Sequence, residues 1–100
     1  MVKYIPNTPA IKAAIMRNLE FADTCGFIIY GCNCVVRAAK RTLVAQGHRM
    51  YQKKGNSKSK QMKADMRIYA VLISMVEEGE VQRELCEDMP GLGTMFSYHL

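Results

Sequence analysis

Apolar residues repeat at helical spacing in several stretches of the chain. The first stripe follows Thr8 and Pro9, a threonine that can cap a helix and a proline that suits its first turn. Gly26 offers a stop at the other end. The pattern predicts a helix over 9–24, whose apolar stripe carries Ile11, Ile15, Leu19 and Ala22.

The next stretch, 27–46, carries two conflicting signals. Its opening run, 27–30, favours a strand by local propensity, but no alternation of apolar and polar residues follows. Residues 35–46 have helical spacing, and Gly47 is a natural stop. We predict one helix over 28–46, apolar nearly all round in its first half and therefore central, with a short hairpin at 27–36 as the alternative. Small side chains on one face of this helix would let another backbone approach closely: Gly31, Cys34, Ala38 and Ala45.

Residues 59–78 carry the most regular signal in the chain. Apolar residues step by three and four along one helix face, with Ser59 as a possible cap and Gly79 as the end. The predicted seam consists of Met62, Met66, Tyr69, Ile73 and Val76, widened by Ile68, Leu72 and Met75.

The last part of the chain predicts a short acidic helix and an apolar tail. Residues 80–88 have an amphipathic pattern with Val81 and Leu85 inward, and Pro90 would stop the helix. The tail, 92–100, is apolar enough to pack on the core or on a partner. The predicted fold class is all-α: a single domain, 1–100, forming a small helical bundle of three main helices plus a short fourth helix, with 28–46 between the others.

Charge is distributed unevenly along the chain. The net charge is +5, but segment 37–67 holds ten basic residues against one acid, Asp65, so the rest of the chain is net negative. Most acids lie between Glu77 and Asp88. The basic segment includes a predicted linker at about 48–58, where turn formers stand among lysines. Two such zones predict a polarised surface, provided the fold keeps them apart.

The predicted helix over 59–78 also has an unfavourable order of charges. Lysines stand at its start and glutamates at its end, the reverse of what the helix dipole favours. We interpret this order as a sign that the charges serve a functional surface.

Membrane, metal and catalytic signatures are weak or missing. The longest apolar run, near 27–36, is far shorter than the roughly 20 residues of a membrane span. The first residues lack the pattern of a signal peptide, so we predict a cytoplasmic location and no membrane partner. The cysteines at 25, 32, 34 and 86 lack the paired spacing of structural zinc, and we expect the first three to be buried thiols. Without a hydrolase, zinc-protease or phosphate-loop motif, we predict no enzyme, no cofactor and no metal.

These features favour a small non-enzymatic nucleic-acid-binding protein. Lysines and arginines around a turn can follow a phosphate backbone, and a tyrosine among them can stack on an unpaired base. Charge alone leaves DNA and RNA undistinguished. The predicted phosphate contacts are Lys40, Arg41, Arg49, Lys53, Lys54, Lys58, Lys60 and Lys63, with Tyr51 as the stacking ring.

The alternative is a small protein that docks on a larger nucleic-acid-processing machine and inhibits or modulates it. Small phage or mobile-element proteins that antagonise host defence, anti-CRISPR proteins among them, share this general character, although no motif links them to this chain. The small-residue face over 28–46 and the methionine seam also leave a homodimer open.

Overall fold

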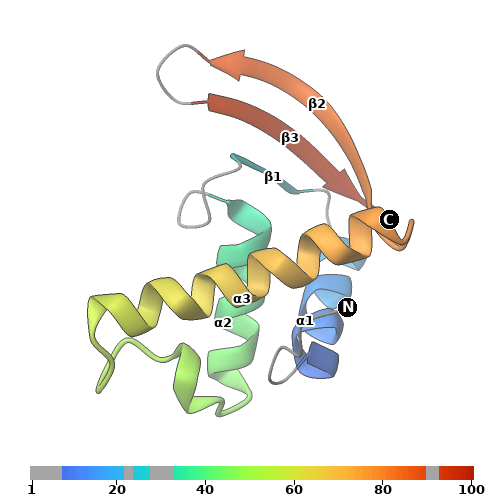
Figure 1. The fold of residues 1–100 in the computed structure, drawn as a ribbon. Coiled ribbons are helices and arrows are strands. Elements are labelled where there is room, and N and C mark those ends of the chain that lie inside the picture. The colour runs from blue at the N-terminus through green and yellow to red at the C-terminus, as the bar shows by residue number, and fades with distance from the viewer. Residues whose placement is uncertain (1–7, 22–23, 28–32, 90–92) are drawn as a thin grey trace.

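The computed structural model describes residues 8–21, 24–27, 33–89 and 93–100. In chain order these form α1 (Thr8–Phe21), β1 (Thr24–Phe27), α2 (Cys34–Ala45), a 3-10 helix η2 (Arg49–Tyr51), α3 (Lys58–Glu77), β2 (Gln82–Met89) and β3 (Gly93–His99). In Figure 1, α3 crosses α2, α1 lies beside them, and the sheet covers the side of the helices away from η2. No helix within these ranges is both long and apolar enough to cross a membrane.

Helix α1 follows the predicted pattern but ends early. Ile11, Ile15 and Leu19 are buried, as the stripe predicts, whereas Ala22 lies outside the described residues. The helix ends at Phe21 rather than at 24, because Thr24 already pairs with β3. Gly26, predicted as a helix stop, belongs to β1.

Helix α2 is shorter and more amphipathic than the predicted helix over 28–46. It begins at Cys34, where Asn33 caps it by accepting hydrogen bonds from the amides of Val35 and Val36. Residues 28–32 lie outside the described residues, and the last three residues of the alternative hairpin, 34–36, belong to α2 instead of a strand. One face of α2 is buried, namely Val35, Val36, Ala39 and Leu43, and the opposite face is basic. This helix is therefore central on one side only.

Helix α3 forms nearly where predicted, but the core contacts a different face. Ser57, rather than Ser59, caps its start, and the chain turns at Gly79 as expected. The buried residues are Ala64, Ile68, Val71, Leu72 and Met75. The predicted seam lies to one side of this face, since Met62 is 59% exposed and Met66 is also exposed. Ile68, Leu72 and Met75, which only widened the predicted seam, are the true centre.

The all-α prediction is wrong, because the described residues include a three-stranded antiparallel sheet in the order β1-β3-β2. The predicted fourth helix, 80–88, is strand β2, and the fourth helical element is only the short η2. The tail forms β3 and packs on the core through the buried Tyr98, as its apolar character predicts. Pro90 lies outside the described residues.

Pairing with the tail explains why 82–89 is a strand. Glutamate and leucine in this segment favour a helix locally, but β3 offers a partner in which β-formers such as Phe96 and Tyr98 alternate toward the helices. Arg83 pairs with Tyr98 and its guanidinium lies 4.3 Å from the centre of the Phe96 ring. A register shift between Leu85 and Glu87 leaves Cys86 as the extra residue of a bulge. Long-range pairing therefore overrides local propensity here.

Asn33 joins the helical layer to the sheet. It is fully buried, its Oδ1 caps α2, and its Nδ2 donates a 3.4 Å hydrogen bond to the Tyr98 hydroxyl. One amide side chain thus connects the start of α2 with the central strand of the sheet.

Candidate functional site

Helix α3 separates the basic and acidic zones. Its 20 residues span about 30 Å, with Lys58, Lys60 and Lys63 in its first two turns and Glu77 at its end. Lys12 of α1 lies at the acidic end, where its Nζ is 3.9 Å from Glu78 Oε2 and 3.6 Å from Glu80 Oε2. The acidic zone is thus partly neutralised by α1 and far from the basic loop, so the predicted polarity of the surface is confirmed.

The basic loop is held in shape by side-chain hydrogen bonds. Asn56 Nδ2 donates to the carbonyl oxygens of Arg49 at 3.1 Å and Gln52 at 2.7 Å. Gln61 Nε2 in turn donates to the Asn56 carbonyl at 3.1 Å, which ties the loop to the first turns of α3. Gly55 takes a left-handed backbone conformation, with φ of +84°, that its lack of a Cβ permits. The predicted linker is therefore a shaped loop that presents its charges in a defined arrangement.

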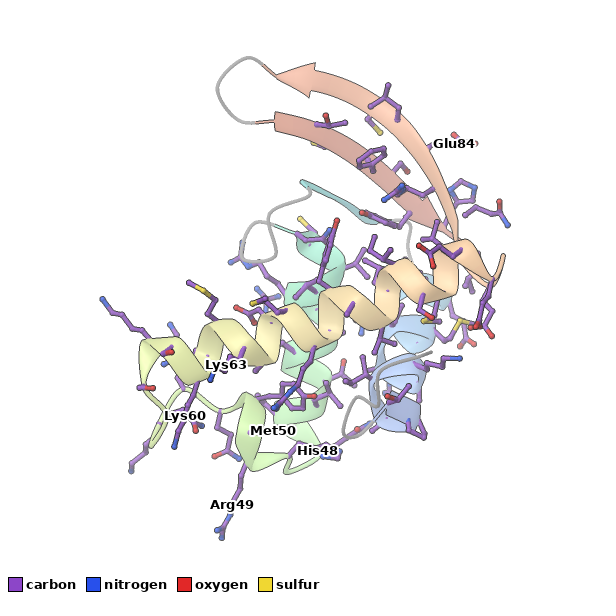
Figure 2. All side chains as sticks on the ribbon, in the orientation of Figure 1. His48, Arg49, Met50, Lys60, Lys63 and Glu84 are labelled. Atoms are coloured by element: carbon purple, nitrogen blue, oxygen red, sulfur yellow. The ribbon has the colours of Figure 1, made fainter. Side chains whose placement is uncertain are left out.

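One group of basic residues surrounds this loop, and we call it the loop cluster. Met50 and Asn56 line both of its two adjoining surface hollows, of about 700 and 280 Å³. Figure 2 shows Lys60 and Lys63 extending from α3 on the side of Met50, and Arg49 pointing away from the helices. The loop cluster consists of Arg49, Lys54, Lys60, Lys63 and Arg67.

A second group surrounds a cavity of about 510 Å³, bounded by α2, the loop and α3. Arg37, Lys40 and Arg41 reach it from α2, because spacings of three and four residues place them on one helix face. Val44, Ala45 and Tyr51 supply an apolar wall, and the remaining lining residues are Lys53 and Asp65. We call this space the Tyr51 cavity.

The only acid of the basic segment lies in this cavity and is already paired. Lys40 Nζ is 3.0 Å from Asp65 Oδ1, and both side chains are only 20% exposed. Among the described residues, no carboxylate forms an ion pair with Arg37, Arg41 or Lys53. The Tyr51 cavity therefore has three basic side chains available to an anionic ligand.

Tyr51 does not have the exposed position that the sequence suggested. It is 1% exposed, because η2 contacts both α2 and α3 and directs the ring into the core. Within the described part of the chain, its hydroxyl is the one buried side-chain N or O atom without a hydrogen-bond partner. Burial raises the pKa of Tyr51 above its ordinary value of 10.0, and the nearby Arg67 offsets this only in part. The predicted surface stacking ring is therefore part of a cavity wall.

The structure thus divides the predicted site between two places. Lys40, Arg41, Tyr51 and Lys53 lie at the Tyr51 cavity, whereas Arg49, Lys54, Lys60 and Lys63 belong to the loop cluster. Lys58 is exposed at the start of α3 and lines neither place. Arg37 and Arg67 were missing from the predicted site, although each lies three or four residues from a predicted one on the same helix face.

The cysteines show no metal site within the described residues, where no three His, Cys, Asp or Glu side chains cluster. Cys34 and Cys86 are free and exposed. The prediction of a buried thiol is wrong for Cys34, which is exposed at the first position of α2.

In comparisons with known proteins, no family model, curated protein or solved structure gives a significant match to this chain.

Proposed function

We propose that this protein binds nucleic acid through the basic surface formed by the loop cluster and the rim of the Tyr51 cavity. The observation that carries this proposal is the gathering of Arg37, Lys40, Arg41, Lys53 and the loop cluster at one end of the molecule with a single acid among them. Such a surface attracts a polyanion and binds it with release of counterions. A cytoplasmic location remains part of this proposal.

The shape of the surface supports phosphate contact over mere solubility. Hydrogen bonds of Asn56 and Gln61 hold the loop that carries Arg49 and Lys54 against α3. Fixed cations lose less conformational freedom on binding than cations on a disordered loop. The lysines at the start of α3 also add to the partial positive charge of its amide groups, which would be unfavourable without an anion to bind.

Fluorescence anisotropy with labelled single- and double-stranded oligonucleotides, in DNA and RNA versions, tests the proposal. The informative variant is Lys60→Ala with Lys63→Ala, which removes two exposed charges from the loop cluster. We expect weaker binding to every sequence. Loss of two phosphate contacts should reduce the slope of log K against log salt by about 1.4 for single strands and about 1.8 for duplexes.

The matched control is Lys12→Ala with Arg17→Ala on α1, which Figure 1 places across the molecule from the start of α3. This variant loses the same charge, so a response to net charge alone would weaken binding equally in both variants. Equal weakening, or no binding of the unaltered protein at physiological salt, would contradict the proposal.

A second candidate function is docking on a nucleic-acid-processing protein. Leu85 on edge strand β2 is 62% exposed, and α3 exposes Met62 and Met66. Exposed apolar side chains are common at protein interfaces. A stable complex that forms without nucleic acid and is lost in Leu85→Ser, but not in Lys60→Ala, would favour this function over the first.

A further inference from the structure

The Tyr51 cavity combines three features that one ligand class satisfies together. Its volume of about 510 Å³ lies within the roughly 300–1,000 Å³ of small-molecule sites. Arg37, Arg41 and Lys53 are its available cations, Val44 and the Tyr51 ring belong to its apolar wall, and Asp65 supplies a hydrogen-bond acceptor. These features call for an anion, a flat apolar body and an N–H donor on the same ligand.

We propose that the Tyr51 cavity binds a single nucleoside monophosphate unit, either free or as an unpaired nucleotide of a strand. The base lies against the apolar wall, an N–H group of the base donates to Asp65, and the phosphate contacts Arg37 and Arg41. Guanidinium groups recognise phosphate through paired hydrogen bonds, which suits them to this role. An aliphatic carboxylate would satisfy the cations and the wall but has no N–H group to donate to Asp65 beside its partner Lys40.

The unpartnered hydroxyl of Tyr51 supports a ligand in this place. A buried hydroxyl without a hydrogen bond is unfavourable, and Tyr51 belongs both to the buried core and to the wall of the cavity. A base has ring nitrogens and exocyclic groups that can exchange hydrogen bonds with a phenol.

The cavity and the loop cluster lie on the two sides of segment 50–54. Tyr51 and Lys53 line the cavity, whereas Met50, Gln52 and Lys54 line a hollow of the loop cluster. A strand with one base in the cavity can therefore pass its backbone over this segment to the loop cluster. The inference rests on the proposed function for its choice of nucleic acid as the source of the anion.

A fluorescent base provides the test, and the protein contains no tryptophan to interfere with it. The probes are 2-aminopurine deoxyriboside monophosphate, a single strand with one internal 2-aminopurine, and the same strand in a duplex. Inorganic phosphate and the 2-aminopurine nucleoside serve as competitors. We expect the monophosphate to bind at least about tenfold tighter than either fragment. If the 2-aminopurine in the single strand responds and the monophosphate does not, the ligand is an unpaired nucleotide of a strand. If the monophosphate responds and the strand does not, the ligand is a free nucleotide.

Ala45→Phe fills the cavity without changing its charge, and Ala13→Phe on the exposed face of α1 is the matched control. We expect Ala45→Phe to weaken the 2-aminopurine response about tenfold or more and Ala13→Phe to leave it unchanged. Equal responses in the two variants, or no response to any probe, would overturn the inference. Anisotropy measured in parallel separates the two proposals. If strand binding depends on Lys60 and Lys63 but not on Ala45, the proposed function is supported and the cavity inference is contradicted. If the monophosphate binds but strands do not bind in a salt-dependent way, the cavity site is supported and the proposed function is contradicted.

Discussion

Lys40 Nζ and Asp65 Oδ1 lie 3.0 Å apart at the wall of the Tyr51 cavity, joining α2 to α3. Asp65 is the only acid between Arg37 and Arg67, so no other carboxylate within the basic segment can neutralise one of its positive charges. The remaining cations keep their charge for a ligand. The same pair helps to set the spacing of the two helices that bound the cavity.

Removing the negative charge of Asp65 should strengthen anion binding. Asp65→Asn keeps an oxygen acceptor and frees Lys40, so we expect oligonucleotides to bind about fivefold tighter or more at low salt, since two unit charges about 4 Å apart interact by about 1 kcal/mol even in bulk water. Loss of this largely buried ion pair should lower the free energy of unfolding by about 1 kcal/mol or more, because Lys40 is left without its partner. Anisotropy and urea unfolding measure the two effects. Glu84→Gln on the exposed β2 removes the same charge far from the cavity (Figure 2), and an equal gain there would show a net-charge effect only.

Tyr51→Phe should make the protein more stable. The hydroxyl is buried without a partner among the described residues, and such a group is unfavourable by about 1–3 kcal/mol. We expect the variant to gain about 1 kcal/mol in free energy of unfolding, which corresponds to about 4–8 °C in Tm for a domain of this size. Thermal unfolding followed by circular dichroism measures the change. A lower Tm would mean that the hydroxyl has a bonding partner in solution.

Ionisation of Tyr51 should destabilise the protein at high pH. Burial raises its pKa in the folded state above the ordinary 10.0, so the unfolded chain releases this proton first as the pH rises. The contribution of the neutral ring to stability is fully present below about pH 10 and is lost as the pH rises through the folded-state pKa. Urea unfolding between about pH 8 and 11 should therefore show a steeper loss of stability in the unaltered protein than in Tyr51→Phe. Parallel pH profiles would disprove this contribution.

Asn33 should be one of the most sensitive positions for stability. Asn33→Ala removes the cap of α2 and the hydrogen bond to the Tyr98 hydroxyl, and we expect a loss of about 2 kcal/mol or more. Asn33→Asp retains the acceptor for the amides of Val35 and Val36 but loses the donor to Tyr98. Urea unfolding should therefore give a lower free energy of unfolding for Asn33→Ala than for Asn33→Asp. The opposite order would mean that burying the aspartate carboxylate is more unfavourable than the retained cap is favourable.

Local sequence signals predicted the helices best where the whole signal lay within one segment. The stripe of α1 and the charge order and end of α3 can be read from neighbouring residues, because helix contacts connect positions three and four apart. The face of α3 that packs was misjudged. Met62 and Met66 lie to one side of the buried face, which includes Ala64 between them, so periodicity alone could not show which side of the apolar stripe the core contacts.

The candidate site was predicted in part for the same reason. Charge density located the basic segment between Arg37 and Arg67, since electrostatic attraction needs only the sign and number of residues. The cavity could not be predicted, because it requires α2, the loop and α3 to meet. The burial of Tyr51 could not be predicted either, since a tyrosine among lysines is expected to be exposed. It is buried because η2 packs against both α2 and α3.

The sequence by itself determined the helix positions of α1 and α3, the polarity of charge along the chain and the turn at Gly79, all of which depend on neighbouring residues. Only the tertiary structure decided that 82–89 is a strand, that Asp65 pairs with Lys40 and that Tyr51 lies in a wall. Each of these depends on a partner many residues away. The free energy of such a contact outweighs local propensity once the chain has folded, but the contact leaves no periodic trace in the segment that it changes.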